Sequence, residues 1–433
     1  MVMILSVVNL ARLFLLFLIS LCLFFFIGDR AIYFFLKHAG PTFIKLGQLL
    51  ANRSDLIGEN LASHLDNLQD NLPAFSAQKA KKIIEDDLKK PLDQIFSEFD
   101  ETPVAAASIA QVHKAITMKG DVVAVKVLRP NINRIFKRDI ATLKLLGFLV
   151  GIFSRYYKAK LNNITEVVED CGVKELDLHF EAAVASELKD KLRDIKGFYI
   201  PKIYWDLSGS KVLVLEWIDG IRFSDREAIL NSGFNLKEVA KNLVIGYLEQ
   251  VYVHGIFHAD MHLGNLFLMK NGDIGVVDFG ITGTIDKNTR IAIARILIAF
   301  LKQDYRGVAQ IHIEAGFVPQ NINLEEFTLS CRIIGESTVG KAVGEVSMAK
   351  LLANLLKMTR KYQMQTRPEL LLLQKTMMLV EGVGVFLDKD LNMWDISRPF
   401  AEEWAKKHMG FDAKIRDFVL DLLKTIKSRS FNN

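Results

Sequence analysis

Three polar side chains with the chemistry of a magnesium–phosphate site lie close together in this 433-residue chain. Asn265 stands five residues after Asp260, and Asp278 follows the short apolar run 274–277. Carboxylate and amide oxygens bind the Mg²⁺ ions that bridge the phosphates of ATP in phosphoryl-transfer sites. We therefore predict that Asn265 and Asp278 bind Mg²⁺. Asp260, which orients a hydroxyl group or a water molecule, is one predicted catalytic residue, together with Lys126 and Glu181.

The order of these residues is that of a protein-kinase core. The chain reads His258-x-Asp260, then Asn265, then Asp278-Phe-Gly, which matches the catalytic loop H-x-D-x₄-N followed by D-F-G. The ordered pair of motifs is far more specific than D-F-G alone. His254, His258 and His262 recur every fourth residue and offer an alternative metal site on a helix. Gly255 and Gly264 favour a loop instead.

A lysine inside an apolar run is the second chemical signal. Residues 122–128 predict a buried strand that contains one charge, Lys126, and an unpaired buried charge is unfavourable. In kinases such a lysine contacts the α- and β-phosphates; the alternative is an edge strand with Lys126 in solvent. A helix is predicted over 173–191. Its acidic residues are Glu175, Asp177, Glu181 and Glu187. Their spacing does not decide which of them pairs with Lys126.

Alanines replace the glycine-rich loop that precedes this strand in a kinase. Glycine lets backbone N–H groups approach phosphates and permits positive φ, whereas a Cβ restricts both. We expect this segment to contact the nucleotide differently from an ordinary kinase loop. Its residues are Ala105, Ala106, Ala107 and Ser108. The strand predicted over 212–218 then leads to the crossing between lobes at 219–220, where Glu216 and Ile218 are further candidate nucleotide contacts.

A long apolar stretch, 2–27, begins the chain. As a helix it would be about 39 Å long, against about 30 Å for a bilayer core. A cleaved signal peptide is the alternative, but no small-x-small site precedes Gly28. The basic residues that follow favour a cytoplasmic body. We predict an uncleaved anchor over 1–28 that spans or lies in the membrane, and a core helix over 145–153, which is too short to span.

Composition excludes several classes of protein. Lys and Arg exceed Asp and Glu by only five, and no basic patch with interleaved aromatics occurs, so no nucleic-acid partner is predicted. Three cysteines without a C-x-x-C motif indicate a reducing compartment.

No A-P-E segment follows Gly280, so the usual peptide-docking device of kinases is missing. Residues 335–341 resemble part of a phosphate-binding P-loop, but Ala342 stands where its Ser or Thr belongs.

Four motifs together resemble the UbiB family of atypical kinases, which is associated with ubiquinone biosynthesis. They are Lys45-x-Gly47-Gln48, the alanine-rich stretch 105–113, Glu175-x-Asp177 and the stretch 258–265. Taken alone, Lys45 and Gln48 also fit the solvated face of an amphipathic helix. The resemblance implies that their helix folds over a nucleotide cleft, which Glu175 and Asp177 also face. It further implies that Glu181 pairs with Lys126, and that ATP and Mg²⁺ are bound.

The sequence thus predicts an α+β protein with a bilobal, protein-kinase-like fold and a membrane-anchor helix. The predicted parts are the anchor 1–28, a helical extension 29–100, an N-lobe 101–218, a C-lobe core 219–310 and a helical region 311–433. The predicted function is ATP turnover in support of ubiquinone biosynthesis at a bacterial inner membrane. A membrane lipid or isoprenoid quinone precursor and quinone-biosynthesis enzymes are the expected partners. The alternatives are a nucleotide-binding pseudokinase scaffold and a protein kinase.

Overall fold

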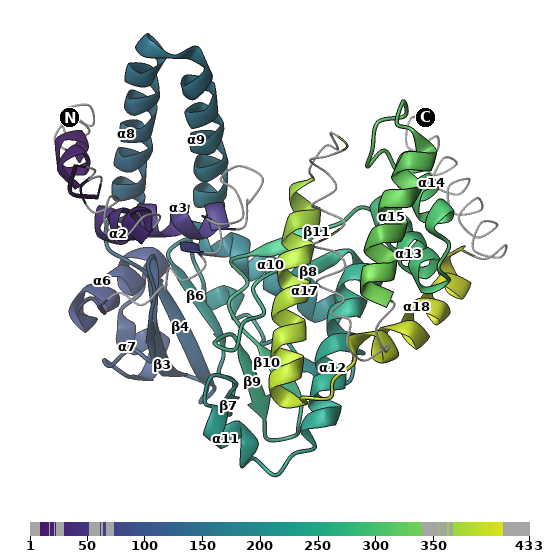
Figure 1. Cartoon of the computed structure of the whole chain (residues 1–433). Coiled ribbons are helices and arrows are strands. Elements are labelled where there is room, and N and C mark those ends of the chain that lie inside the picture. The colour runs from purple at the N-terminus through teal and green to yellow at the C-terminus, as the bar shows by residue number, and fades with distance from the viewer. Residues whose placement is uncertain are drawn as a thin grey trace, which may run out of the picture. The chain divides into compact units, whose positions relative to one another are not determined.

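Two compact units make up the computed structural model (Figure 1). Unit 1 comprises residues 1–189, 201–218 and 278–280, and unit 2 comprises 190–200, 219–277 and 281–433. The structure describes residues 9–16, 18–20, 22, 30–51, 61, 64–65, 73–339, 354, 362 and 367–409. Both units combine sheet and helix, which confirms the predicted mixed α and β character.

An antiparallel sheet forms the centre of unit 1. Its strands are β1 (Phe96–Phe99), β2 (Ala105–Ala106), β3 (Ala110–Thr117), β4 (Val122–Leu128) and β6 (Val212–Glu216). They are ordered β1-β3-β4-β6, and β2 also pairs with β3. Strand β4 is therefore internal, which excludes the alternative of an edge strand for Lys126.

The alternation of side chains along β4 explains how a charge fits into this strand. Val123, Val125 and Val127 are fully buried and belong to one apolar cluster with residues of α6 and β6. Because successive side chains of a strand point to opposite faces, Lys126 projects from the other face of the sheet. The valines hold the strand in the core, and the lysine is directed away from it.

Helices surround the sheet of unit 1. They are α2 (Arg30–Ala39), α3 (Pro41–Ala51), α6 (Ala77–Leu88), α7 (Leu92–Ile95), α8 (Ile132–Phe153), α9 (Arg155–Glu175) and α10 (Leu178–Lys191), with the 3₁₀ turn η1 (Trp205–Leu207). Helices α8 and α9 form an antiparallel hairpin (Figure 1). Side chains of α2, α3, α8 and α9 share one apolar cluster, so the helical extension packs on the base of this hairpin.

Unit 2 contains two small sheets and most of the C-terminal helices. Its strands are β5 (Phe198–Tyr199), β7 (Gly220–Arg222), β8 (Ile256–His258), β9 (Leu266–Met269), β10 (Ile274–Val276) and β11 (Thr282–Thr284). One sheet has the order β5-β10-β9-β7, and β8 pairs with β11 in the other. The helices are α11 (Arg226–Leu230), α12 (Leu236–Leu248), α13 (Lys287–Leu301), α14 (Tyr305–Glu314), α15 (Leu324–Val339), α17 (Pro368–Leu387) and α18 (Met393–Met409), with a π-helical turn, η2 (Glu249–His254).

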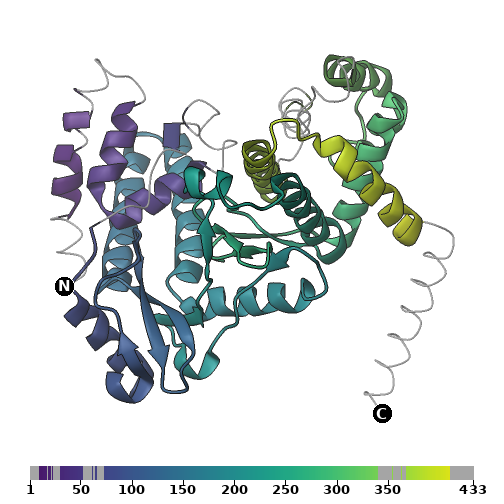
Figure 2. The same cartoon turned by 90° about the horizontal axis from the view of Figure 1, so that it is seen from below.

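A second apolar segment, besides the N-terminal stretch, is long enough to cross a membrane. Helix α17 has 20 residues and contains an 18-residue window with a mean hydropathy of 1.6, and within the described residues it alone meets the length and composition of a span. It packs beside α12 (Figures 1 and 2), and Tyr247 of α12 donates a hydrogen bond to the Leu373 carbonyl. These contacts are those of a core helix in unit 2.

The N-terminal anchor stays a prediction. Residues 9–16 and 18–20 are helical, and Leu13 is buried in an apolar cluster of unit 1. The rest of segment 1–28, apart from Cys22, lies outside the described residues. The C-terminal stretch 413–426, whose apolar residues follow a helical spacing, also lies outside them, as do residues 340–342 at the end of the P-loop-like segment. The part of that segment up to Val339 is helical, in α15.

Three predicted elements differ from the structure. The helix predicted over 173–191 is broken between α9 and α10, because the Asp177 carboxylate accepts a hydrogen bond from the His179 N–H and starts a new helix. The helical extension 29–100 ends in a strand, β1, which pairs with β3. The core helix predicted over 145–153 forms the exposed end of α8, where Phe153 is 90% accessible.

We expect Asp87→Ala to destabilise unit 1, since the Asp87 carboxylate holds the segment that leads into β6. It accepts hydrogen bonds from the N–H groups of Lys211 and Val212 and from the Ser210 hydroxyl, at 2.8–3.2 Å. Their loss should lower the free energy of unfolding by about 1–3 kcal/mol in urea titrations. Asp86→Ala, at an exposed neighbouring position, should change it by less than about 0.5 kcal/mol. Equal effects of the two variants would contradict this role.

Candidate functional site

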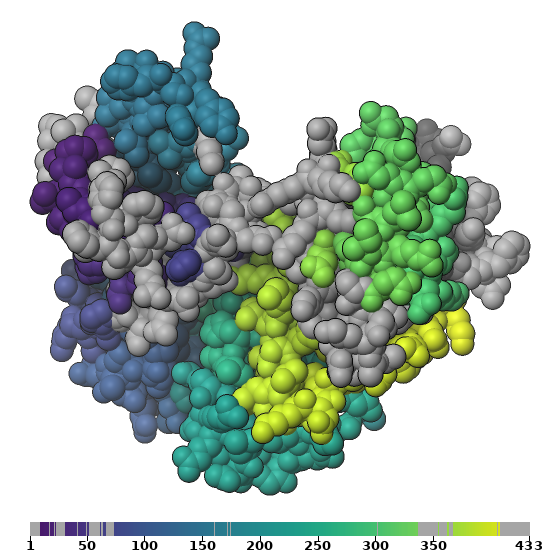
Figure 3. All heavy atoms as spheres, in the orientation of Figure 1, coloured from purple at the N-terminus to yellow at the C-terminus, as the bar shows by residue number. Residues whose placement is uncertain are grey.

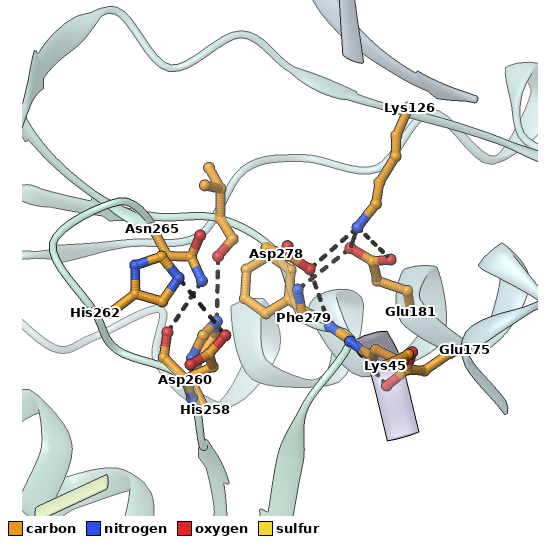
Figure 4. A network of polar contacts seen from close by, with 12 residues as sticks. Lys45, Lys126, Glu175, Glu181, His258, Asp260, His262, Asn265, Asp278 and Phe279 are labelled. Carbon is orange, nitrogen blue, oxygen red and sulfur yellow. Dashed lines mark hydrogen bonds and ion pairs between the residues drawn. The ribbon is translucent and has the colours of Figure 1, made fainter. Parts of the chain in front are cut away.

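A buried ion pair joins the central strand of unit 1 to α10. The Lys126 ammonium lies 2.8 and 2.9 Å from the two carboxylate oxygens of Glu181 (Figure 4). Helix α10 presents Glu181 here because Leu178, Glu181, Ala182, Ala185 and Leu188 share its buried face. Of the four acidic residues that the sequence left open, Glu181 is thus the one that contacts Lys126.

Asp278 and Phe279 join the same cluster within unit 1. The Lys126 ammonium lies 3.1 Å from Asp278 Oδ1, and the Phe279 N–H donates to Glu181 Oε1 at 3.3 Å (Figure 4). Asp278 has a φ of +64°, in the left-handed region, which Asp tolerates better than most residues. The phenyl ring of Phe279 is buried, whereas the Asp278 side chain is 49% accessible. Glu181 therefore fixes both the lysine and the backbone that follows Asp278.

Burial and charge act against each other in this cluster. Burial alone would lower the pKa of Lys126, but the carboxylates of Asp278 and Glu181 outweigh it and raise this pKa above its ordinary value. Burial raises the pKa of Glu181, and the Lys126 cation counteracts part of that rise. With both carboxyl groups ionised, one cation faces two anions, which leaves a net charge of −1.

A second ion pair ties the helical extension to the corner between α9 and α10. Lys45 of α3 lies 3.1 Å from Glu175, the last residue of α9, and both side chains are largely buried. Gln48 lies one turn further along α3. Asp177 is the residue that starts α10 and contacts the His179 ring at 3.1 Å. The contact with Lys45 therefore holds the corner between α9 and α10 in place. Glu181 lies in α10, three residues after that helix begins.

The alanine segment is a strand followed by a tight turn, which corrects the loop expected over 105–107. Ala105 and Ala106 form β2, and the Ala107 N–H donates to the Ala110 carbonyl. The Arg129 guanidinium donates to the Ala107 carbonyl at 2.9 Å and braces the turn. Ser108 is fully buried in it, and its hydroxyl has no hydrogen-bond partner among the described residues.

The loop between β8 and β9 in unit 2 is held by His258. Its Nδ1 accepts a hydrogen bond from the Asp260 N–H at 3.1 Å, so the proton belongs on Nε2, which lies 3.2 Å from the Val277 carbonyl (Figure 4). Both ring nitrogens are thereby engaged, which argues against His258 as a metal ligand. His258 instead connects the backbone of Asp260 to the residue before Asp278.

Asn265 closes the same loop. Its amide Nδ2 donates to the Asp260 carbonyl at 3.0 Å, and its own carbonyl accepts from the Val277 N–H (Figure 4). The Asn265 side chain is buried, whereas Asp260 is partly exposed, with His262 Nε2 at 3.7 Å from its carboxylate. With Nδ2 engaged in this way, the amide oxygen remains the group that a cation would contact.

Two further residues, which the sequence motifs do not include, position these groups. Gln250 is buried in the π-helical turn, and its amide oxygen accepts the His258 N–H at 2.9 Å. Thr376 of α17 donates to the Ala259 carbonyl at 3.2 Å. A lone Gln or Thr in an apolar helix carries no pattern that would have identified either. Of the two candidate nucleotide contacts at the lobe crossing, Glu216 accepts a hydrogen bond from the Lys202 N–H and Ile218 is buried, and their role stays a prediction.

Known proteins resemble this chain over both units. Residues 67–312 match the ABC1 atypical kinase-like domain, and 331–392 match the UbiB helical domain. The probable protein kinase UbiB of Marinobacter nauticus is 38% identical over 391 residues, which are 88% of this chain and 71% of that protein. The one from Azotobacter vinelandii is 39% identical over 381 residues, 86% of this chain and 71% of that protein. The ABC1 match confirms the predicted kinase-like fold.

One solved structure resembles the chain in fold. The Rv3197–erythromycin complex from Mycobacterium tuberculosis has a TM-score of 0.55 and 24% sequence identity, and the match covers 81% of this chain and 90% of that one. This likeness concerns the fold alone.

Lys126→Met should make stability depend on pH. The variant removes the cation that lowers the Glu181 pKa and leaves burial and Asp278, which both raise it. A carboxyl group whose pKa is higher in the folded state favours folding as the pH falls toward that pKa. We expect a loss of about 3–5 kcal/mol near pH 8 that shrinks toward pH 5, measured as urea midpoints. Lys144→Met, in the exposed pair with Glu169, should cost less than about 1 kcal/mol. A deficit in Lys126→Met that does not change with pH would contradict this role of the Lys126 cation.

A double-mutant cycle should detect the Lys45–Glu175 pair. Lys45→Met and Glu175→Gln each remove the contact between these two largely buried charges, so the double variant should be less destabilised than the sum of the single ones. We expect a coupling energy of about 1–3 kcal/mol in unfolding experiments. Additive effects would show that the contact does not contribute to stability.

Proposed function

The chain belongs to the UbiB family of atypical kinase-like proteins, and on that basis we propose that it binds ATP with Mg²⁺ and turns it over at a membrane in support of ubiquinone biosynthesis. The observation that carries this proposal is the cluster of Lys126, Glu181 and Asp278. The lysine is held in the core by an internal strand, whereas the Asp278 carboxylate is half accessible. A kinase-type site requires this combination of a fixed cation and an available carboxylate.

The residues present fit a magnesium nucleotide in charge and in donor type. Two carboxylates around one ammonium leave a surplus negative charge, which a divalent cation would compensate. Asn265 offers an amide oxygen, the other ligand type of such sites. The buried Ser108 hydroxyl, without a partner among the described residues, is a further polar group that a phosphate oxygen would satisfy.

Each residue has a role in this proposal. Asp278 would hold the metal, and Lys126 would contact the phosphates under the positional control of Glu181. Asn265 is the second metal ligand that the motif spacing predicts. Asp260 orients the attacking hydroxyl group or water molecule. Bound Mg²⁺-ATP supplies the phosphoryl group and an electrophilic phosphorus. Lys45 and Glu175 act on the α9–α10 corner and thereby on Glu181, so they are positioning residues.

Two other functions remain as outcomes of the tests. A pseudokinase scaffold would bind nucleotide without turnover, although it would have no need for a metal-binding carboxylate next to Lys126. A protein kinase would phosphorylate a peptide, yet the chain lacks the A-P-E segment that usually docks one. We therefore propose hydrolysis of ATP or transfer to a small acceptor. An isoprenoid quinone precursor or a membrane lipid is the proposed ligand or effector.

Asp278→Asn should abolish magnesium-dependent turnover and leave the fold intact. Asn tolerates the same left-handed backbone conformation but cannot neutralise the cation. We expect ATP hydrolysis to fall by at least roughly 100-fold, which corresponds to about 2.7 kcal/mol of transition-state stabilisation. Asp273→Asn provides the matched control, since Asp273 lies in the turn between β9 and β10 and contacts Asn271.

Assays on the full-length protein, with and without vesicles and a phenolic quinone-precursor analogue, distinguish the candidate functions. Unchanged turnover and Mg²⁺-ATP affinity in Asp278→Asn would exclude the proposed metal role. Saturable nucleotide binding without turnover in the unsubstituted protein would favour the scaffold.

A further inference from the structure

The end of the α8–α9 hairpin exposes an unusual amount of apolar surface. Phe148 is 61% accessible, Ile152 66% and Phe153 90%, and Tyr156 and Tyr157 at the start of α9 are similarly exposed. We call residues 146–158 the hairpin tip. These residues cover the last turns of α8 and the first turn of α9, at the top of unit 1 in Figures 1 and 3. Large exposed apolar patches mark sites of protein or membrane interaction.

Glycine spacing shows that this exposure is built into the hairpin. Gly147 and Gly151 lie one turn apart on the side of α8 that faces α9. A Cβ at Gly147 would lie 2.8 Å from Asn162 Oδ1, and one at Gly151 would lie 2.5 Å from Lys158 Cδ. The small residues therefore bring the two helices together, while the bulky ones point outward. Packing within the hairpin does not require the exposed aromatic and aliphatic side chains.

The charges around the tip are of one sign. Between residues 140 and 165 the chain contains Lys144, Arg155, Lys158 and Lys160 and no acidic residue. Lys144 pairs with Glu169 further down the hairpin, whereas Arg155 and Lys158 are exposed at the tip itself. The neighbouring rings of Tyr156 and Tyr157 contact each other edge to face, 5.4 Å apart. Apolar residues at an end, flanked by tyrosines and basic residues, match the layers of an anionic membrane interface.

A second apolar surface is attached to the same hairpin. Asn9 of the N-terminal helical segment donates hydrogen bonds to Asp139 and Thr142 of α8. The outer side chains of that segment, Phe14 and Leu15, are about 60% accessible. The hairpin therefore carries two exposed apolar surfaces, and the N-terminal one belongs to the stretch whose composition predicts membrane association.

We propose that the hairpin tip inserts into the interface of a bilayer that contains anionic phospholipid. This names the element through which the membrane association proposed above takes place, and so it rests on that part of the proposed function. The outward side chains of α8 enter the acyl boundary, the tyrosines lie at headgroup depth, and Arg155 and Lys158 contact the lipid phosphates. A protein partner would have to match both the apolar end and the basic ring, whereas an anionic bilayer presents both complements at once.

A site-specific probe tests insertion directly in the full-length protein. Phe153→Cys, labelled with a polarity-sensitive fluorophore, is mixed with vesicles of phosphatidylcholine and phosphatidylglycerol. Ile333→Cys, at an exposed apolar position on α15, is the control, and the labelled parent protein gives the background from its own cysteines. We expect a blue shift and protection from an aqueous quencher at position 153 only. An aqueous signal at position 153 in vesicle-bound protein, or no binding to these vesicles, would overturn the proposal.

Substitutions test how much the tip contributes. The triple variant Phe148→Gln, Ile152→Gln and Phe153→Gln changes only exposed side chains, and Leu329→Gln with Ile333→Gln on α15 is its control. In vesicle flotation we expect the triple variant to bind at least about tenfold more weakly than the control. Parent protein should also bind phosphatidylcholine vesicles more weakly than vesicles with phosphatidylglycerol. Equal binding of the triple variant and its control would contradict the proposal. Equal binding of the parent protein to the two vesicle types would contradict it as well.

Two further measurements distinguish membrane insertion from a nucleotide-binding defect and from self-association. Mg²⁺-ATP affinity should be the same in the triple variant and its control. If none of the proteins binds the nucleotide, the proposed nucleotide function is wrong, and the vesicle experiments still test the membrane contact. Sedimentation of the parent and triple variant reports the oligomeric state. A dimer that dissociates only in the triple variant would assign the tip to a second copy of the chain and overturn the proposal.

Discussion

The contact between Lys126 and Glu181 is the constraint on which the rest of unit 1 depends. Both groups are largely buried, and an uncompensated buried charge is strongly destabilising, so neither can be placed without the other. The pair therefore fixes the position of α10 relative to the central strand. Through the Phe279 N–H it also fixes the backbone next to Asp278. A single carboxylate thus determines the arrangement of a lysine, a helix and the segment with the candidate metal ligand.

The remaining polar contacts serve to hold the candidate groups in place. In unit 1 the Lys45–Glu175 pair secures the corner from which α10 starts, and Glu181 lies in the first turn of that helix. In unit 2, Gln250 and His258 fix the backbone around Asp260, and Asn265 closes that loop. These contacts engage the backbone of Asp260 and the amide nitrogen of Asn265, and the Asn265 amide oxygen takes no part in them.

Spacing predicted the kinase-like core better than it predicted the contacts around each residue of that core. The order of Asp260, Asn265 and Asp278 and the apolar run around Lys126 identify a kinase-like core because each spacing reflects a loop or strand of fixed length. The partner of Lys126 required the structure, since four acidic residues lie within reach in sequence and a break at Asp177 changes which face each occupies. The exposure of 145–153 was not predictable, because an apolar helix end has the same sequence pattern in a core and at a membrane surface. The Gln250 side chain accepts a hydrogen bond from the His258 N–H. The residues next to Gln250 in the sequence do not indicate this contact.

The central claim is that a preformed cluster of one cation and two carboxylates prepares this chain for a magnesium nucleotide. Calorimetric titration of ATP into the full-length protein, with and without Mg²⁺, tests it most directly. The account predicts saturable binding at one site that is strongly weakened when Mg²⁺ is removed by a chelator, because two anions around Lys126 would then face the phosphates without a compensating cation. Equal affinity with and without Mg²⁺, or no binding in either condition, would contradict it.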